Sequence, residues 1–372
     1  MPCMTTPSFH RREFLLASSL SAMGGLMGCA STQAAVATPR LRLIGEARLP
    51  HKLQYKNTTV GGLSGIDYDP VSGMLYLLSD DGASQGAPRF YTARLALTPD
   101  KLGDIELSGV TFLQGLTSPD PEAVRWHAPS QTLLWTSEGN ALLAAPPSLQ
   151  QTRLDGTLAR SFELPAMFGF GLVSGSRINK TFEGLAITPD GRHAWLSMEA
   201  ALRQDGPEPT VTVPGGPCRF TQIDIATGKA VRQIAYVPDA IPKAPSPFSA
   251  DADNGVVEVL MLDAHRMLVL ERAYMAGLND RERNSMRFYA INTRLATDTL
   301  NISALKPGNY TPAAKTLVAD FASFAALTRL DNTEGMCWGP NLPNSNRTLL
   351  FVSDDNFNPR QITQFLAFEF LD

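Results

Sequence analysis

Cysteine is scarce in this sequence, and the few that it has are poorly placed for cross-linking. Only 4 of the 372 residues are cysteine. Cys3 and Cys29 fall in an N-terminal segment with the features of an export signal, which leaves Cys218 and Cys337 far apart in the chain. Two isolated cysteines make neither a disulfide framework nor the ligand spacing of a zinc site. Cys337 stands in an apolar run, where we expect a small buried hydrophobic residue.

The sequence also has no excess of basic over acidic residues. The chain has 32 Lys and Arg against 36 Asp and Glu, a formal net charge of −4. A nucleic-acid-binding protein needs a basic face, so the composition excludes that class. Beyond the N-terminal segment, no apolar run is long enough for a membrane-spanning helix.

Histidine is rare, and the usual signature of a serine esterase is absent. Of 5 histidines, His127, His193 and His265 stand at or beside expected turns, where we expect them to face solvent. No Gly-x-Ser-x-Gly elbow occurs, so a nucleophilic serine triad has no support.

Residues 1–37 have the pattern of an export signal and a short tether. Arg11 and Arg12 form a twin-arginine pair, an apolar run covers residues 15–27, and Leu-Met-Gly-Cys at 26–29 resembles a bacterial lipobox. This predicts lipidation at Cys29 and an exported, periplasmic lipoprotein anchored to the membrane. Cleavage after the Ala-Val-Ala at 35–37, which would release a soluble periplasmic protein, and a native helix are the alternatives.

Residues 38–372 carry a fivefold repeat. A start resembling Glu-Gly-Leu is followed about 15 to 20 residues later by an apolar strand that ends in carboxylates. The starts lie at residues 62–66, 121–124, 182–185, 257–260 and 333–336, and the ends at 77–81, 135–138, 196–199, 268–271 and 351–355.

Each repeat predicts four antiparallel strands. A third strand is repeated at residues 89–95, 219–225 and 287–291, and a fourth is clearest at 229–237. Four strands in each unit of about 60 to 80 residues are typical of a β-propeller blade, so we predict an all-β propeller in a single domain, 38–372.

The chain ends predict how the propeller closes. The last repeat supplies three strands, and residues 41–49 would add its missing outer strand, which removes open sheet edges. We therefore predict five blades; a sixth, degenerate blade inside a long insertion is the alternative. Among the insertions, residues 273–285 and 320–330 are expected to carry short helices.

The repeated acidic positions predict a carboxylate-rich centre. The first strand of a blade lines the axis, so Ser64, Glu122, Glu183, Glu258 and Glu334 are expected to form a ring. The second strands end in a further set of carboxylates: Asp80, Asp81, Glu138, Glu199, Glu271, Asp354 and Asp355.

Two interpretations of these carboxylates remain open. Crowded carboxylates need cations or hydrogen-bond donors, and a ligand set made only of oxygen suits Ca²⁺ or Mg²⁺. We therefore predict metal ligands at Asp80, Asp81, Glu122, Glu183, Glu334, Asp354 and Asp355. Alternatively, each carboxylate bonds the backbone of the next blade and is structural, as its repetition in nearly every blade would suggest.

Basic residues near the acidic strand ends could bind an anionic substrate. Arg89, Arg219 and Arg287 each begin a third strand, and a guanidinium suits bidentate binding of an anion. Salt bridges to the same carboxylates are the alternative.

The repeated motifs resemble a known family. Residues 62–70, 79–81, 182–186, 334–336 and 353–357 are similar to the phytase-like propellers, described by an esterase-like activity of phytase. The resemblance covers roughly residues 45–370. It implies a propeller fold, bacterial export and hydrolysis of a phosphoester or carboxylester with Ca²⁺. The second repeat departs from the pattern with Glu122-Ala123-Val124, and the fourth ends in Glu271-Arg272.

Three functional hypotheses follow. The first is an exported Ca²⁺-dependent hydrolase, a monomer that acts on a small ester or phosphoester. The second is a periplasmic binding or scaffold propeller whose carboxylates are structural. The third is a lactonase-like metal hydrolase.

Overall fold

The computed structural model describes residues 39–81, 85–115 and 119–372. The described residues belong to one compact unit, Thr38–Asp372. The predicted export signal and its lipidation site Cys29 lie outside the described residues. No helix in the described part of the chain is long and apolar enough to cross a membrane.

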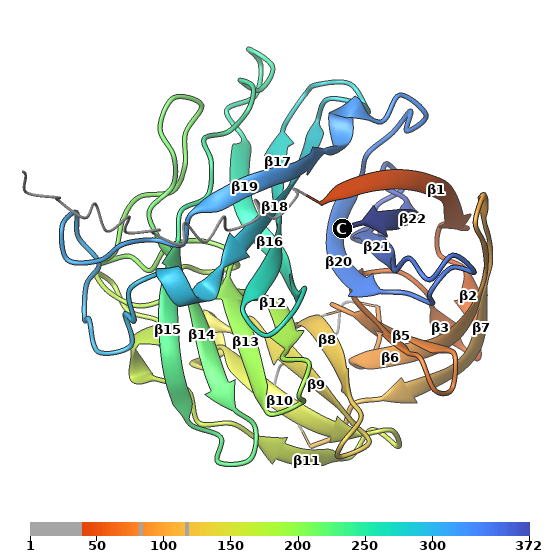
Figure 1. Cartoon of the computed structure of the whole chain (residues 1–372), viewed down its shortest axis with the longest axis horizontal. Coiled ribbons are helices and arrows are strands. Elements are labelled where there is room, and N and C mark those ends of the chain that lie inside the picture. The colour runs from red at the N-terminus through yellow and green to blue at the C-terminus, as the bar shows by residue number, and fades with distance from the viewer. Residues whose placement is uncertain (1–38, 82–84, 116–118) are drawn as a thin grey trace, which may run out of the picture. The chain divides into compact units, whose positions relative to one another are not determined.

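Five four-stranded antiparallel sheets follow one another around an axis (Figure 1). Blade 1 comprises β4 (Leu63–Asp69), β5 (Met74–Ser79), β6 (Arg89–Thr98) and β7 (Lys101–Phe112); blade 2 comprises β8 (Pro121–His127), β9 (Thr132–Ser137), β10 (Ser148–Arg153) and β11 (Leu158–Ser161); blade 3 comprises β12 (Phe182–Ile187), β13 (His193–Met198), β14 (Cys218–Asp224) and β15 (Ala230–Tyr236); blade 4 comprises β16 (Ala252–Met261), β17 (Arg266–Met275), β18 (Asn284–Asn292) and β19 (Lys315–Asp320); blade 5 comprises β20 (Asn332–Trp338), β21 (Thr348–Asp354), β22 (Thr363–Leu371) and β1 (Arg40–Leu49). The predicted five-bladed propeller is confirmed.

The N-terminal strand closes the ring, as the sequence predicts. β1 pairs with β22 from Arg40↔Leu371 to Leu49↔Thr363, and the two strands lie side by side in Figure 1. Each inner strand contacts the next, in the order β4, β8, β12, β16, β20 and back to β4. Blades 1 and 5 are therefore neighbours, which brings strand ends far apart in the sequence to one side of the axis.

Apolar side chains pack in layers between neighbouring blades. One cluster joins blades 5 and 1 and contains Leu77, Tyr91 and Val352, all fully buried. Another joins blades 4 and 5, where Phe351 packs edge-on against Phe288 with ring centroids 5.9 Å apart. Burial of an aliphatic or aromatic side chain stabilises the fold by roughly 1.5–3 kcal/mol, so these layers hold the blades in register.

The prediction of short helices at residues 273–285 and 320–330 is wrong. Residues 320–330 contain only the 3₁₀ turn η4 (Phe321–Ser323), whose first turn is capped by the Asp320 carboxylate accepting from Ala322 N. The helix-like spacing of Phe321 and Phe324 instead serves packing, since both rings contact Phe368. Residues 273–285 are taken up by the ends of β17 and β18 and a turn. The other short elements are β2 (Gln54–Tyr55), β3 (Thr58–Thr59), η1 (Ala141–Leu143), η2 (Ala166–Phe168) and η3 (Thr293–Leu295).

A buried ion pair lies between the inner strands. Arg125 Nη2 of β8 lies 2.8 Å from Glu258 Oε2 of β16, and both side chains are at most 3 % exposed. Arg125 also donates to the carbonyl oxygens of Ile66 and Val259, and Glu258 accepts from Leu185 N. The pair thus links four of the five inner strands. Burial raises the pKa of Glu258 to about 7, although the Arg125 charge opposes the shift.

Removal of the closing strand should destabilise the propeller. A chain that starts at residue 50 loses the buried Ile44 and the partly buried Leu43 and exposes the β22 edge. We expect a loss of at least about 3 kcal/mol in the free energy of unfolding relative to a chain that starts at residue 38. Equal denaturant midpoints for the two chains would contradict the closure.

Glu258 should make stability depend on pH. Its pKa is raised in the folded state, so its favourable contribution is present at low pH and is lost as pH rises from about 4.5 through about 7. The stability of the wild type minus that of E258Q should therefore fall by roughly 3 kcal/mol between pH 4.5 and 8. Denaturant melts across this range measure the difference, and parallel curves would show that Glu258 does not titrate in this way.

Candidate functional site

One end of the propeller axis holds an acidic cavity of about 440 Å³. Its carboxylates come from every blade or from the segment preceding a blade: Asp80, Asp120, Glu122, Glu138, Glu183, Glu199, Asp253, Glu334 and Asp354. Only two of its lining residues are basic, Lys180 and Arg272. The predicted carboxylate-rich centre therefore exists, with a membership that differs from the predicted one.

A β-bulge in each inner strand positions the first group of side chains. The pairing of every inner strand with its neighbour shifts by a residue near its start, for example between Phe182 and Gly184 and between Thr333 and Gly335. Bulges re-aim the side chain of the extra residue. The bulged positions are Ser64, Glu122 with Ala123, Glu183, Val257 and Glu334.

The glycine after a bulge lets the neighbouring inner strand come close. A Cβ at Gly65 would lie 2.6 Å from the Glu122 carbonyl oxygen, and one at Gly335 would lie 2.6 Å from that of Ser64. Ser64 itself donates to the Glu122 carbonyl oxygen at 3.0 Å. The Glu-Gly pair of the repeat thus combines a side chain for the cavity with a close contact between blades.

The second group follows the end of each second strand. The register makes Asp80, Glu138, Glu199, Arg272 and Asp354 equivalent positions, and all five line the cavity. A backbone bond fixes several of them: Asp80 N donates to Gly62 O at 2.7 Å and Glu199 N to Thr181 O at 2.7 Å. Blades 1, 2, 3 and 5 supply carboxylates here, and blade 4 supplies arginine.

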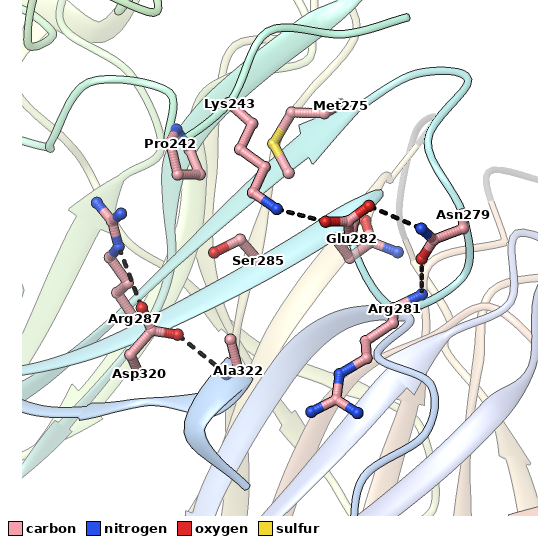
Figure 2. A pocket seen from close by; sticks show the side chains of 11 residues that line it. Pro242, Lys243, Met275, Asn279, Arg281, Glu282, Ser285, Arg287, Asp320 and Ala322 are labelled. Carbon is pink, nitrogen blue, oxygen red and sulfur yellow. Dashed lines mark hydrogen bonds and ion pairs between the residues drawn. The ribbon is translucent and has the colours of Figure 1, made fainter. Parts of the chain in front are cut away.

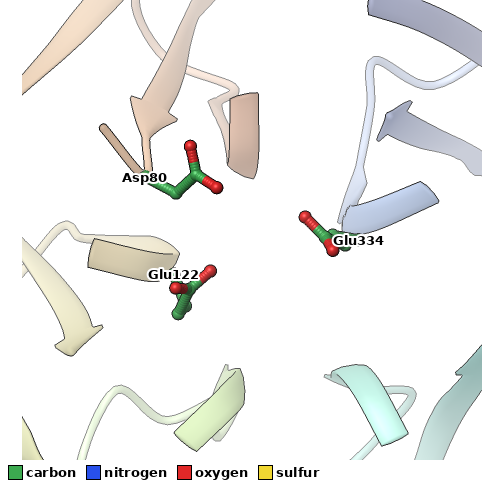
Figure 3. Close-up of side chains that lie close together, drawn as sticks. All are labelled: Asp80, Glu122 and Glu334. Atoms are coloured by element: carbon green, nitrogen blue, oxygen red, sulfur yellow. The ribbon is translucent and has the colours of Figure 1, made fainter. Parts of the chain in front are cut away.

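Two sets of carboxylates could each hold a cation. Ligand oxygens of Asp80, Glu122 and Glu334 all lie within 4.8 Å of one another, and the same is true of Asp120, Glu122 and Glu138. Figure 3 shows the side chains of the first set converging from three separate segments. Since Ca²⁺–oxygen distances are 2.3–2.6 Å, oxygens on opposite sides of one ion lie about 4.8 Å apart. The spacing therefore fits such an ion.

Glu122, which belongs to both sets, is buried without a partner. It is 8 % exposed and lines the cavity. Within the described residues its carboxyl group has no hydrogen bond and no ion pair. Its carboxylate faces the cavity, where a cation would compensate the charge, so Glu122 is a candidate ligand.

The crowded carboxyl groups have raised pKa values. For Asp80, Glu122 and Glu183, burial raises the pKa well above its ordinary range, and neighbouring carboxylates raise it further. Burial also raises the pKa of Glu138, to about 8, against the opposing hydrogen bond from Thr181 N. Burial and crowding therefore favour the protonated form of these carboxyl groups when no cation is bound.

In blade 4 the strand register differs from the alignment of the repeats made from the sequence. Glu258 and Glu271 were expected among the central carboxylates, but the register shifts both by one position, so that Val257 stands at the bulge, buried in the apolar core, and Arg272 lines the cavity. Glu258 pairs with Arg125, and Glu271 accepts from Tyr236 Oη at 2.5 Å and from Lys315 Nζ at 2.6 Å. Both carboxylates are structural.

Asp81 and Asp355 do not line the cavity. Asp81 lies 2.8 Å from Arg89 Nη1 in a fully buried ion pair. Asp355 accepts from Gly62 N at 3.0 Å and from Phe357 N at 3.1 Å, and so joins blade 5 to the start of blade 1. Of the seven predicted metal ligands, the cavity brings together Asp80, Glu122, Glu183, Glu334 and Asp354.

Arg89 and Arg219 are buried inside the blades, away from the cavity. Arg89 donates to Asp81 and to the Thr59 carbonyl oxygen. Arg219 is 0 % exposed and binds both carboxylate oxygens of Asp205. Neither guanidinium is placed for substrate binding, and for these two the salt-bridge alternative describes the contacts.

Arg287 lines a second pocket, of about 500 Å³, at the edge of blade 4 (Figure 2). It lies 3.3 Å from Asp239 and 3.8 Å from Asp320. This pocket contains both signs of charge, including the ion pair of Lys243 with Glu282. Arg287 is thus separate from the acidic cavity.

The sequence alone missed Asp120, Lys180 and Asp253 as lining residues of the cavity. Asp120 and Lys180 stand immediately before or two residues before an inner strand, and Asp253 lies near the start of β16. These residues share a position shortly before the start of a repeat motif. Because no residue type recurs at that position, a sequence pattern could not identify them.

The chain matches one protein family and, at low similarity, several solved structures. No curated protein matches the chain. The solved structures include the Dos1 propeller (7 % identity, TM-score 0.35, 82 % of this chain and 68 % of that one), hydrazine synthase of Kuenenia stuttgartiensis (11 %, 0.36, 81 % and 80 %) and the periplasmic gluconolactonase of Pseudomonas aeruginosa (13 %, 0.37, 84 % and 89 %). The family model described as phytase-like, esterase-like activity of phytase, matches residues 58–357, which include all five inner strands and every acidic side chain that lines the cavity. The chain therefore belongs to the phytase-like propeller family.

Proposed function

We propose that the protein is a metal-dependent hydrolase of a small phosphoester or carboxylester, and that the acidic cavity is its site. The observation that carries this proposal is the Glu122 side chain, which is buried, has no partner within the described residues, and is shared by two sets of three carboxylates whose oxygens lie within 4.8 Å of one another in each set. Membership of the phytase-like family supports the reaction class. The substrate would be bound at the axial end where the cavity opens.

The donor set fits calcium. Every acidic group within reach offers oxygen, and the described histidines and cysteines are not among the lining residues. Oxygen ligands from flexible carboxylates suit Ca²⁺, whereas Zn²⁺ prefers nitrogen or sulfur in a tetrahedral set. Asp80, Glu122 and Glu334 would hold the ion, and Asp120 and Glu138 form the adjoining set.

The residues of this chain would bind and orient the substrate around that ion. A cation held there would neutralise the carboxylates and polarise a phosphoryl or carbonyl oxygen. Lys180 and Arg272 supply the positive charge among the described lining residues and lie against Glu199, Asp253 and Glu334. Asn332 and Tyr274 add polar side chains to the lining.

Some carboxylates make contacts that fit the structural interpretation, whereas Glu122 makes none within the described residues. Glu138 accepts from Thr181 N at 2.5 Å, and Asp355 accepts from Gly62 N, so both join neighbouring blades. Glu122 makes no such bond within the described chain. A purely structural ring would leave this carboxyl group without a role.

We also propose that the protein is exported and carries a lipid at Cys29, as its N-terminal sequence predicts. The acidic cavity would then meet Ca²⁺ outside the cytoplasm. Mass spectrometry of the mature N-terminus tests this: an acylated Cys29 is expected, and an N-terminus at residue 38 would show the soluble form.

Calcium should stabilise the protein through Glu122. At a concentration a hundredfold above Kd, a bound ion adds about 2.7 kcal/mol to the free energy of unfolding. E122Q should lose most of this gain, and E163Q, which changes an exposed glutamate, should retain it. Thermal melts with calcium and with a chelator measure the effect. An equal response of E122Q and wild type would show that calcium does not bind at this cavity.

Hydrolysis of the substrate should depend on bound calcium. We expect hydrolysis of p-nitrophenyl phosphate or p-nitrophenyl acetate by the wild type, loss of activity with a chelator, and a decrease of roughly 10- to 100-fold in E122Q. Calcium binding without turnover of either ester would favour a binding propeller. Neither binding nor turnover would leave the structural alternative.

A further inference from the structure

Blade 4 breaks the fivefold pattern of the cavity. At the bulge it carries Val257, and at the end of its second strand it carries Arg272, where the other blades carry Asp80, Glu138, Glu199 and Asp354. Of the five blades, it alone supplies no carboxylate at either position. The sequence records the break as Glu271-Arg272, and the proposed hydrolase chemistry does not account for it.

Arg272 bridges carboxylates of the two adjacent blades. Its Nη1 lies 2.9 Å from Glu334 Oε1 in blade 5, and its Nη2 lies 3.6 Å from Glu199 Oε1, which follows blade 3's second strand. Its Nη1 also contacts the Asn332 side-chain oxygen. The guanidinium is therefore in the position that a cation shared by these carboxylates would take.

Lys180 lies in the same half of the cavity as Arg272. Its Nζ lies 3.2 Å from Asp253 and 4.0 Å from Glu199. Together with Arg272 it faces the carboxylates of blades 3 and 4. Neither basic residue has a contact within 4 Å to Asp80 or Glu122 in the described structure.

The two basic residues divide the cavity electrostatically. Arg272 and Lys180 lie against Glu199, Asp253 and Glu334. On the side of blades 1 and 2, Asp80 and Glu122 have no ion pair within the described residues. Glu334 lies at the boundary between the two halves.

We propose that Arg272 is a built-in cation that takes the place of a second metal ion. On this account, which rests on the proposed metal site, the cavity binds one divalent cation at Asp80, Glu122 and Glu334, and the guanidinium excludes another from the Glu183, Glu199 and Glu334 side. Arg272 is a specificity-determining residue that sets the number of ions.

Counting calcium ions tests this proposal. Equilibrium dialysis of the described unit, residues 38–372, should find about one tightly bound Ca²⁺ in the wild type and about two in R272Q, because the removed charge frees a second set of oxygen ligands. R272K, which keeps the charge, should bind about one ion. R281Q is the matched control, since it removes the charge of an exposed arginine and should also leave about one.

The outcomes separate this proposal from the proposed function. One ion in the wild type and one in R272Q would overturn the role of Arg272 and leave the metal site intact. No ion in any variant would overturn both. R272Q is expected to need calcium for folding, because a bound ion replaces the lost charge, so its failure to fold even in calcium would also contradict the proposal.

Discussion

The bulge near the start of each inner strand is the constraint on which this site depends. It adds one residue to a strand whose neighbours are packed against it on both sides. In blades 2, 3 and 5 this places Glu122, Glu183 and Glu334 in the lining of the cavity. The glycine after the bulge, such as Gly65 or Gly335, has no Cβ and therefore lets the next inner strand approach closely. The same local device therefore builds the ring and fills its centre with carboxylates.

A centre of this kind has to be neutralised, and the chain does so in three ways. Glu258 is paired with Arg125 between the inner strands, and Glu199 is paired with Lys180 and Arg272. Glu138 is bonded to the backbone of the next blade. Glu122 has none of these compensations within the described residues, so a cation in the cavity would supply the missing charge.

Much of the fold could be predicted because it repeats. Apolar strands at a regular period predict blades, and the closing strand follows from the count of three strands in the last repeat. Blade 4 could not be aligned correctly from residue identities alone, because Glu258 matches the motif whereas the strand register places Val257 at the bulge. Burial of Arg89 and Arg219 likewise depends on partners distant in sequence, such as Thr59 and Asp205.

Anomalous X-ray diffraction from crystals grown with calcium tests the central claim most directly. The account predicts one anomalous difference peak between the carboxylates of Asp80, Glu122 and Glu334, at Ca²⁺–oxygen distances of about 2.3–2.6 Å. An empty cavity at saturating calcium, with the Glu122 carboxyl group hydrogen-bonded to a neighbouring residue instead, would contradict it.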